Sequence, residues 1–365
     1  MAFGLSSFTS LFKSDTQKTS AKGSVIGVDV GVSAIKVVQI KNAKGVPTLE
    51  TYGELQLGPY EGIEVGRNTH LPTQKSIEAL IDILREAGTS GKEVAFALPY
   101  NSSFINVVSL PTIDTEQVAS MIPIEARKYI PISLTQVSLD WFILGVNESE
   151  KTMQVLILAT YAETLSKYGT IMTGAGLSTI AQEVEVFSSV RSTASLKDES
   201  IAIIDFGASS SRLYLVEKGV IKKTHSILMS GVELTRAVSS ALGISFEEAE
   251  EQKRIFGMHG NTDDPRLQKA MLGVLERGLR ELHTVTARYE ESNNTKVQKV
   301  VTSGSGALLK GFNKYVGDMF SVPVALADPF AKVAYPAFLE DTLKEAGPSF
   351  AVAVGTALRA FQTTK

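Results

Sequence analysis

The chain has 365 residues, of which 44% are hydrophobic and 21% are charged, and its formal net charge at pH 7 is -3. This length and composition are typical of a globular protein with two or more domains. The absence of cysteine excludes disulfide bonds, thiol nucleophiles and cysteine-based zinc sites. There is no Lys- and Arg-rich run suited to nucleic acid, and no apolar run near the ~20 residues of a membrane-spanning helix. We therefore expect a cytoplasmic protein with no nucleic-acid ligand and no transmembrane segment.

The N-terminal stretch is first apolar, reading MAFGLSSFTSLF, and then polar, reading KSDTQKTSAKGS. It lacks the basic start and the long apolar region of a signal peptide. We predict that residues 1–23 form a flexible N-terminal tail. A short amphipathic turn that touches a membrane or a partner is the alternative.

The chain then alternates strand-like and helix-like patterns, which predicts the α/β class. Residues 24–60 predict a meander of three strands, at 25–30, 35–41 and about 49–57, and Val and Ile dominate the first two. A helix is predicted at 76–86, where apolar residues recur on one face, and GKEVAFALP predicts a strand that ends at its proline.

Residues 94–177 have a different pattern from what precedes them. A helix that begins near Asp114 and Thr115 and stops at Pro131 is predicted first, with a kink or break at Pro123. Two strands, VSLDWFIL and TMQVLILATYA, and a second helix, ETLSKYGTIMTGAGL, follow. We predict that this segment is a compact α+β unit inserted into the chain.

The segment IAIIDFGASSSRLYLVEKGVI repeats the pattern of VIGVDVGVSAIKVVQIK from the start of the chain. In both copies a strand ends in Asp-x-Gly, a tight turn follows, and a second strand leads to a Gly-Val turn. The aligned pairs are Asp29 with Asp205, Gly31 with Gly207, Ser33 with Ser209, and Lys36 with Arg212. Self-similarity of a whole strand-turn-strand unit predicts two domains that are built alike.

The two repeated turns have a composition suited to a phosphate ligand. The glycine lets the backbone bend closely, and the next residues can present N–H groups and hydroxyls into one concavity. Asp29 and Asp205 would hold a hydrated Mg²⁺ rather than the phosphate itself, because like charges repel. One copy alone reads as an ordinary β-turn. The presence of two copies favours a polyphosphate site gripped from both sides.

Two further segments are candidate parts of a nucleotide site. KVVTSGSGALLKGF predicts a strand at 300–303, a turn at Gly304, Ser305 and Gly306, and a helix starting at 307–309. It matches neither the Walker A nor the dinucleotide glycine motif, and plain strand-to-helix packing explains it equally well. In ISFEEAEEQKRIF, Glu250 and Lys253 lie three apart on one helix face, which is also typical of a solvated ion pair.

The order of these motifs resembles the actin/Hsp70/FtsA superfamily of ATP-binding proteins over most of the chain, from about residue 24 to residue 360. The resemblance implies an actin-like (ribonuclease H-like) duplicated two-lobe α/β fold that binds ATP or ADP with Mg²⁺. It implies phosphate contacts from Gly31, Ser33, Ala34, Lys36, Gly207, Ser209 and Ser210. It implies adenosine contacts from Glu250, Lys253, Gly304, Ser305 and Gly306. It assigns Asp29 and Asp205 to Mg²⁺ through water, and Glu185, in AQEVEVFSSVRS, to positioning the attacking water.

Within the superfamily, IEARKYIPISLTQVSLDWFIL, SGVELTRAVSSALGISFEEAEEQK and VPVALADPF resemble the PilM family of type IV pilus assembly. The resemblance implies that 94–177 is the inserted subdomain 1C. Lobe 1 (1A) would comprise 24–93, 178–199 and a C-terminal helix at 348–362, and lobe 2 (2A/2B) would comprise 200–347. Members bind the cytoplasmic N-terminal peptide of the inner-membrane protein PilN. That contact, expected at the 1A/1C region, links them indirectly to PilO, PilP and the pilus motor.

Four functions remain open from the sequence. The first is an ATP-binding assembly scaffold, peripheral to the inner membrane through its partner and capable of self-association. The second is an actin-like ATPase with real turnover through Glu185. The third is an FtsA-like cell-division protein, although the ending AVGTALRAFQTTK lacks a basic amphipathic helix. The fourth is a sugar kinase, for which no catalytic Asp in a substrate cleft is evident.

Overall fold

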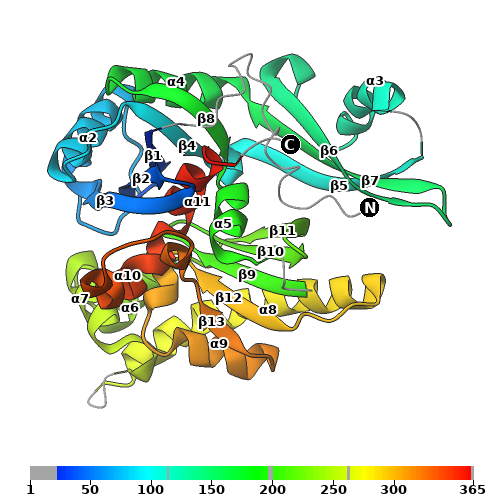
Figure 1. The fold of residues 1–365 in the computed structure, drawn as a ribbon. Helices are drawn as coiled ribbons and strands as arrows, with labels where there is room; N and C mark the ends of the chain where they lie inside the picture. Colours follow the sequence, from blue (N-terminus) through cyan, green and yellow to red (C-terminus); the bar gives the residue numbers. More distant parts are fainter. Residues whose placement is uncertain (1–22, 113–114, 196–199, 261–263, 363–365) are drawn as a thin grey trace.

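The computed structural model describes residues 23–112, 115–195, 200–260 and 264–362. Residues 1–22 of the predicted tail and the predicted helix start at Asp114 lie outside these ranges. The described part of the chain forms two lobes with an extra unit at one side (Figure 1).

Each lobe is built on a five-stranded mixed sheet with the same topology. The first sheet has the order β3-β2-β1-β4-β8, with an antiparallel meander followed by two parallel strands. Its strands are β1 (Ser24–Val30), β2 (Ala34–Ala43), β3 (Val46–Gln56), β4 (Glu93–Leu98) and β8 (Ser178–Val184). The predicted three-strand meander is therefore confirmed.

The second sheet repeats this plan in the order β11-β10-β9-β12-β13. Its strands are β9 (Ser200–Phe206), β10 (Ser211–Glu217), β11 (Val220–Ile227), β12 (Lys299–Ser303) and β13 (Val324–Leu326). Because β9 occupies the place of β1 and β12 the place of β4, the two Asp-x-Gly turns leave equivalent strands. The duplicated two-lobe α/β fold predicted from the repeat is confirmed.

Helices cover both faces of the first sheet, which is why its central strands are apolar on both sides. On one side lie α2 (Thr73–Glu86) and α4 (Ala162–Gly174), and on the other lie α5 (Glu185–Thr193) and α11 (Ala351–Arg359). Helix α11 comes so close that a Cβ on Gly27 would collide with the carbonyl of Ala353. Arg359 of α11 also pairs at 3.0 Å with Glu183, which is fully buried.

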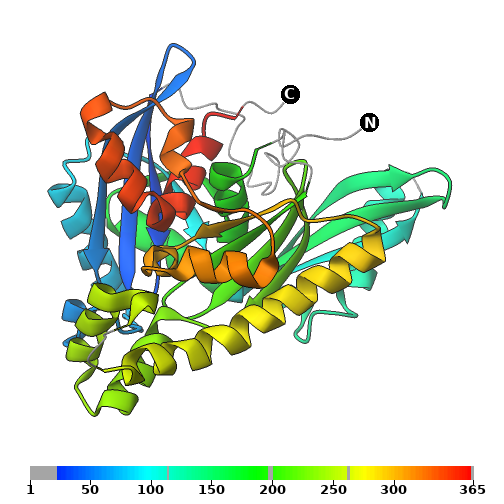
Figure 2. The same ribbon diagram turned by 90° about the horizontal axis from the view of Figure 1, so that it is seen from below.

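The second sheet packs against α-helices that include α6 (Gly231–Leu242), α7 (Phe246–Phe256), α8 (Arg266–Asn293) and α9 (Phe312–Phe320). The long helix α8 runs beneath β9 to β11 and on toward the extra unit (Figure 2). The helix predicted to begin at 307–309 is wrong: Ser305–Leu308 form a 3-10 turn, and α9 begins only after Gly311. Gly311 adopts a positive φ of 82°, so the chain changes direction there before the helix starts.

The extra unit is a three-stranded sheet in the order β5-β7-β6, covered on one face by α3 (Thr115–Ala126). Its strands are β5 (Ser103–Pro111), β6 (Val137–Asn147) and β7 (Thr152–Tyr161). The sequence did not predict β5. The boundary expected at residue 94 falls inside β4, which pairs with β1, and α4 packs on α2 of lobe 1. We therefore propose that the insert comprises residues 99–161.

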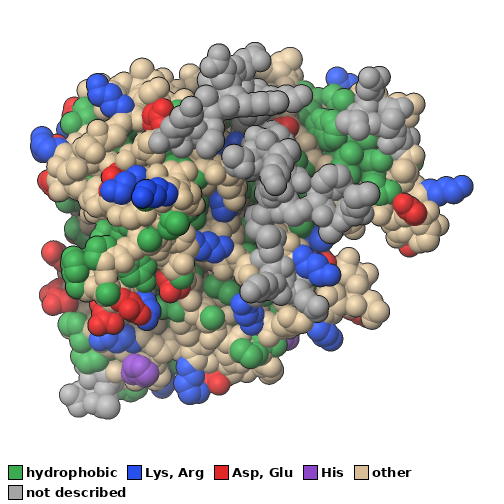
Figure 3. Space-filling model, viewed as in Figure 1, with side chains coloured by type: hydrophobic (Ala, Val, Ile, Leu, Met, Phe, Trp, Pro, Cys, Tyr) green, Lys and Arg blue, Asp and Glu red, His purple; other side chains and the backbone are tan. Residues whose placement is uncertain are grey.

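Lys and Arg side chains are interspersed with Asp, Glu and neutral residues over the face seen in Figure 3. Hydrophobic side chains gather at the upper right of this view, over the insert. None of the helices in the described ranges combines the length and the apolar character that crossing a membrane requires.

Candidate functional site

The two repeated turns have nearly the same geometry. The N–H of Gly31 donates to the carbonyl of Ala34 at 3.0 Å, and the N–H of Gly207 donates to the carbonyl of Ser210 at 3.1 Å. At either glycine, an added Cβ would lie within about 3 Å of that carbonyl oxygen, at 3.0 and 2.9 Å respectively. The glycines therefore permit turns that a larger residue would open. In the flanking hairpins Asp29 is opposite Lys36 and Asp205 is opposite Arg212.

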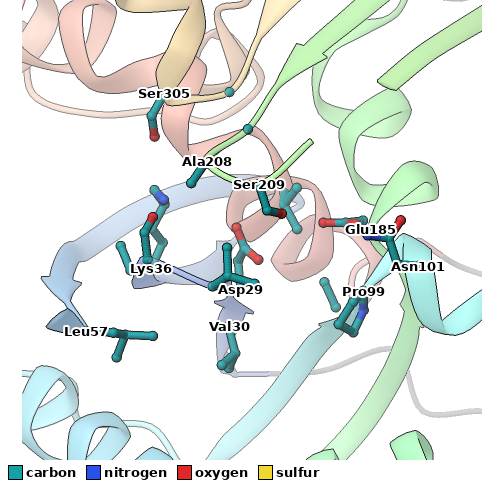
Figure 4. Close-up of a pocket in the computed structure, with 18 of the residues that line it drawn as sticks. Asp29, Val30, Lys36, Leu57, Pro99, Asn101, Glu185, Ala208, Ser209 and Ser305 are labelled. Atoms are coloured by element: carbon teal, nitrogen blue, oxygen red, sulfur yellow. The ribbon is translucent and has the colours of Figure 1, made fainter. Parts of the chain in front are cut away.

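A cleft between the lobes brings the predicted site residues together in two adjoining cavities. Figure 4 shows the first of them. The first cavity, of about 330 Å³, is lined by Asp29, Gly31, Ser33, Ala34, Lys36, Glu185, Asp205, Gly207, Ser209, Ser210, Gly304 and Ser305. The second, of about 320 Å³, is lined by Glu250, Lys253, Ser305 and Gly306, and shares Ser33, Gly207 and Ala208 with the first. Residues from distant parts of the sequence thus form one continuous cleft.

The third glycine element closes the cleft from the side of lobe 2. Gly304 has a φ of 82°, and a Cβ there would lie 2.5 Å from the carbonyl oxygen of Phe206 and 2.7 Å from Oδ1 of Asp205. A Cβ on Gly306 would collide with the ring of Phe206. These glycines therefore let β12 and its turn approach the Asp205 turn closely. Ser305 lies on the shared wall between the two cavities.

Acidic groups from both lobes meet in the first cavity. Burial raises the pKa of Asp29 to about 7, against the opposing effect of Lys36, and the nearby carboxylates of Glu185 and Asp205 raise it further. Burial also raises the pKa of Glu185, against the opposing effect of Arg212. The site therefore holds an excess of carboxylates that a cation would stabilise.

Glu185, the first residue of α5, is held in place by two donors. The backbone N–H of Tyr100 donates to Glu185 Oε1 at 2.6 Å, and Arg212 Nη2 lies 3.1 Å from the same oxygen. Arg212 Nη1 also lies 3.6 Å from Asp205 Oδ2, and Tyr214 donates to that oxygen at 3.3 Å. Arg212 thus links the predicted water-positioning residue to the predicted magnesium ligand of lobe 2.

The second cavity has a polar floor made by α6 and α7. Lys253 Nζ lies 2.6 Å from Glu250 Oε2 and donates to Thr235 at 2.9 Å. Although burial alone would raise the pKa of Glu250, Lys253 and the other donors lower it overall, while burial lowers the pKa of Lys253. Glu250 and Lys253 are therefore an ion pair at the cavity wall, not a solvated surface pair.

A loop of lobe 1 reaches the rim of this cavity. The guanidinium carbon of Arg67 lies 4.2 Å from the ring centre of Phe246 in lobe 2, a cation–π distance. The same loop returns to the first turn, where Thr69 donates to the carbonyl of Val32 at 2.7 Å. Residues 66–69 therefore connect the turn of lobe 1 to the far side of the cleft.

Sequence reasoning did not place Arg212 or Tyr100 in the site. Arg212 carried a signal, because it aligns with Lys36 in the repeat and a cation in both copies points to an anionic ligand. Tyr100 carried none, since it acts through its backbone N–H and follows a proline in a loop. Pro99, Asn101 and Tyr168 also line the first cavity without having been predicted.

The residues present fit a magnesium–nucleotide ligand. Ser210 lines the first cavity, and its Oγ is buried with no hydrogen-bond partner within the described part of the chain. Lys36 is 8% exposed and lines the same cavity. Two carboxylates, Asp29 and Asp205, match the one or two that Mg²⁺ takes from protein when phosphates and water supply its other ligands.

Two lobes with the same five-stranded topology, which close on a cleft lined by paired Asp-x-Gly turns, define the α/β actin-like ATPase fold. Within that class, residues 27–361 match the family described as type IV pilus assembly protein PilM, and the chain therefore belongs to this family.

Solved structures agree with this fold. A PilM-PilN type IV pilus biogenesis complex superposes with a TM-score of 0.80 and 24% identity, covering 94% of this chain and 99% of that one. The ethanolamine utilization protein EutJ from Carboxydothermus hydrogenoformans gives a TM-score of 0.54 and 15% identity, covering 94% and 92%. MreB5 of Spiroplasma citri bound to ADP gives 0.51 and 13%, covering 92% and 95%.

Proposed function

We propose that this protein binds ATP or ADP with Mg²⁺ between its lobes and serves as a nucleotide-dependent scaffold of the type IV pilus inner-membrane assembly complex, on the cytoplasmic side. The observation that carries the proposal is the pair of matched turns that face one cleft from two lobes. A related fold, MreB5 of Spiroplasma citri, was solved with ADP. A ligand held by both lobes favours the closed arrangement, so nucleotide would bias a conformational equilibrium.

Each part of the cleft has a separate task in this proposal. Backbone N–H groups after Gly31 and Gly207, with the side chains of Ser33, Ser209 and Ser210, bind the phosphates. Lys36 adds a positive charge beside them, and Ala34 keeps the wall of the first turn free of a bulky side chain. Asp29 and Asp205 would hold a hydrated Mg²⁺, which would supply positive charge beside the phosphates.

The second cavity takes the nucleoside. Gly304, Ser305 and Gly306 bring the backbone of lobe 2 close to the adenine ring. Glu250 and Lys253 line the side of the cavity that is suited to the ribose hydroxyls. The stack of Arg67 on Phe246 stands at the rim between the lobes. Binding here therefore requires both lobes, as the scaffold proposal demands.

Turnover of ATP is the second candidate function, because Glu185 lines the phosphate cavity. A carboxylate that is to orient water needs a free lone pair directed at that water. Glu185 Oε1 already accepts from Tyr100 and faces Arg212, which leaves Oε2 for water. We infer slow hydrolysis, which would make nucleotide state a long-lived signal.

Binding of a fluorescent ATP analogue with Mg²⁺, compared between wild type and Asp29→Ala, tests the nucleotide site. We expect the variant to bind about 10- to 100-fold more weakly with an unchanged circular dichroism spectrum, as for loss of a group that orients a metal. Asp318→Ala, on the exposed face of α9, is the matched control and should bind like wild type. Equal affinity of Asp29→Ala and wild type would remove the basis of the proposal.

We further propose that the insert binds the cytoplasmic N-terminal peptide of PilN, and through it PilO and PilP. PilM was solved with PilN in a structure that this chain resembles. Strand β6 pairs only with β7 among the described strands, and a strand at the edge of a sheet is a common acceptor of an extended peptide. The insert also exposes several large apolar side chains, namely Ile124, Tyr129, Val146 and Tyr161. Hydrophobic side chains gather over the insert in Figure 3, as is typical of a protein-binding surface.

The sequence contains one tryptophan, and Trp141 lies on β6, so its fluorescence can report peptide binding directly. We expect the PilN peptide to change this fluorescence with a saturable dependence on concentration. Val146→Glu, which places a charge on β6 at a side chain 50% exposed, should weaken binding about tenfold. Val46→Glu, on β3 and 52% exposed, is the matched control. If both variants bound like wild type, the docking surface would lie elsewhere.

A further inference from the structure

Tyr100 stands where three parts of the molecule meet. It follows β4 of lobe 1 after Pro99 and opens a 3-10 turn, Tyr100–Ser102, that leads directly into β5 of the insert. Its hydroxyl lies 2.8 Å from Oγ1 of Thr224, on β11 of lobe 2. Tyr100 therefore contacts lobe 1, the insert and lobe 2 at once, beside the direct packing of β5 on β11.

The same residue also contacts the nucleotide cleft. Its backbone N–H donates to Glu185 Oε1 at 2.6 Å, and its ring centre lies 5.6 Å from the guanidinium carbon of Arg212. Arg212 in turn reaches Glu185 and Asp205. A shift of the Tyr100 backbone would thus change the hydrogen bonding of a carboxylate whose charge is costly to leave unpaired.

The connection from Tyr100 to the insert is short and is held by a hydrogen bond. Only Asn101 and Ser102 separate it from β5, and Ser102 closes the turn by donating to the carbonyl of Pro99 at 2.7 Å. Strand β5 is then paired along its length with β7, to which β6 is also paired. A movement of the sheet as a unit would therefore shift the N–H of Tyr100.

We propose that Tyr100 is a positioning residue that couples the insert to Glu185 and to lobe 2. The proposal rests on the nucleotide function described above and adds its route of regulation. When the lobes close on nucleotide, Glu185 and Thr224 fix Tyr100 and thereby β5. By thermodynamic reciprocity, a partner that binds the insert more tightly when nucleotide is bound must raise the affinity for nucleotide by the same factor.

Hydrogen exchange of β5 amides with and without Mg-ATP tests the coupling. In wild type, nucleotide should slow exchange in β5 about fivefold, at the low end of measured coupling between sites. Tyr100→Phe and Thr224→Val each remove the link to lobe 2, and Glu185→Ala removes the acceptor of the Tyr100 N–H. Each should reduce the slowing to less than about twofold. Tyr129→Phe, which removes an exposed hydroxyl of the same insert, is the matched control and should keep the full slowing.

Affinity for the fluorescent ATP analogue is measured on every variant, which separates this inference from the proposed function. Nucleotide binding by Tyr100→Phe at wild-type affinity, together with an undiminished slowing of β5, would overturn the role of Tyr100 alone. If bound nucleotide left hydrogen exchange in the wild-type insert unchanged, the role of Tyr100 would be overturned as well. Failure of the wild-type protein to bind nucleotide would overturn the proposed function and this inference together. A purely structural role would lower stability in Tyr100→Phe without changing the nucleotide-dependent difference.

Discussion

The turns after β1 and β9 are copies of one motif, yet the cation opposite the aspartate makes different ion pairs in the two copies. In lobe 1 the cation opposite the aspartate is Lys36, whose Nζ lies 3.9 Å from Glu54 on the neighbouring strand. In lobe 2 the cation is Arg212, which reaches both Asp205 and Glu185. In lobe 1 the cation pairs with a residue of its own sheet, and in lobe 2 the cation pairs with a residue across the cleft.

The difference follows from the shapes of the two cations. An ammonium is a single point charge, whereas a guanidinium presents several N–H groups in a planar fork and can serve two carboxylates at once. Arg212 therefore connects lobe 2 to α5 of lobe 1, which Lys36 cannot do. Asp29 has no guanidinium partner of this kind, and burial raises its pKa. A bound Mg²⁺ would stabilise the charged form of Asp29.

The largest expected effect comes from removing each cation. Arg212→Ala leaves the partly buried Glu185 and the buried Asp205 without their common partner, and should cost about 3 to 5 kcal/mol of unfolding free energy. Lys36→Ala should cost about 1 kcal/mol or less, because its ion pair is long and Asp29 can remain protonated. Urea unfolding of the nucleotide-free proteins measures both. Equal costs would show that the two turns are energetically alike.

A smaller effect is expected in the pH dependence of stability. The folded-state pKa of Asp29 is about 7, above its unfolded value of 3.8, so the folded state holds the proton more tightly. The resulting contribution to the free energy of unfolding is fully present below about pH 4 and is lost as the pH rises through 7. Between about pH 5 and about pH 8, wild type should lose about 2 to 3 kcal/mol more than Asp29→Asn, which cannot ionise. Parallel pH profiles of the two proteins, measured by urea unfolding, would contradict the raised pKa.

The smallest effect concerns Ser210, whose counterpart in the first turn is Ala34. Since Ser210 Oγ is buried without a partner in the described ranges, Ser210→Ala should leave the nucleotide-free protein as stable or up to about 1 kcal/mol more stable. It should nevertheless weaken ATP binding a few-fold, because a phosphate hydrogen bond is lost. The reciprocal change, Ala34→Ser, should lower the stability of the nucleotide-free protein by about 1 kcal/mol. Weaker binding and lower stability together in Ser210→Ala would indicate a structural role instead.

Most of the fold could be predicted from the sequence because the repeat is local and strong. Strands rich in Val and Ile, each ending in Asp-x-Gly, determine where both sheets lie. Strand β5 was missed because its residues are mixed in polarity and follow an irregular turn, so its pairing with β7 stabilises it more than its own pattern does. The helix expected at 307–309 failed for a similar reason, since Gly311 delays the start of α9.

The parts of the candidate site that the backbone turns form could be predicted from the sequence. The contacts that depend on how the lobes pack could not. Glycine turns and their aspartates are encoded by adjacent residues, and all of the predicted site residues line the cleft. The direction of the Arg212 fork, and the choice of the Tyr100 N–H as a donor to Glu185, depend on how the lobes pack. No spacing in a single sequence carries that information.

The position of α11 has a consequence for how the protein is made. This helix packs on β1 and supplies Arg359 to the buried Glu183, yet it leaves the ribosome after every other helix and strand of the described chain. Lobe 1 therefore begins synthesis first and is completed last, while the five strands of lobe 2 are already available to pair. Until α11 emerges, the nascent first sheet lacks one of the two helices, α5 and α11, that cover one of its apolar faces, and this is the stage at which a chaperone would have most to protect.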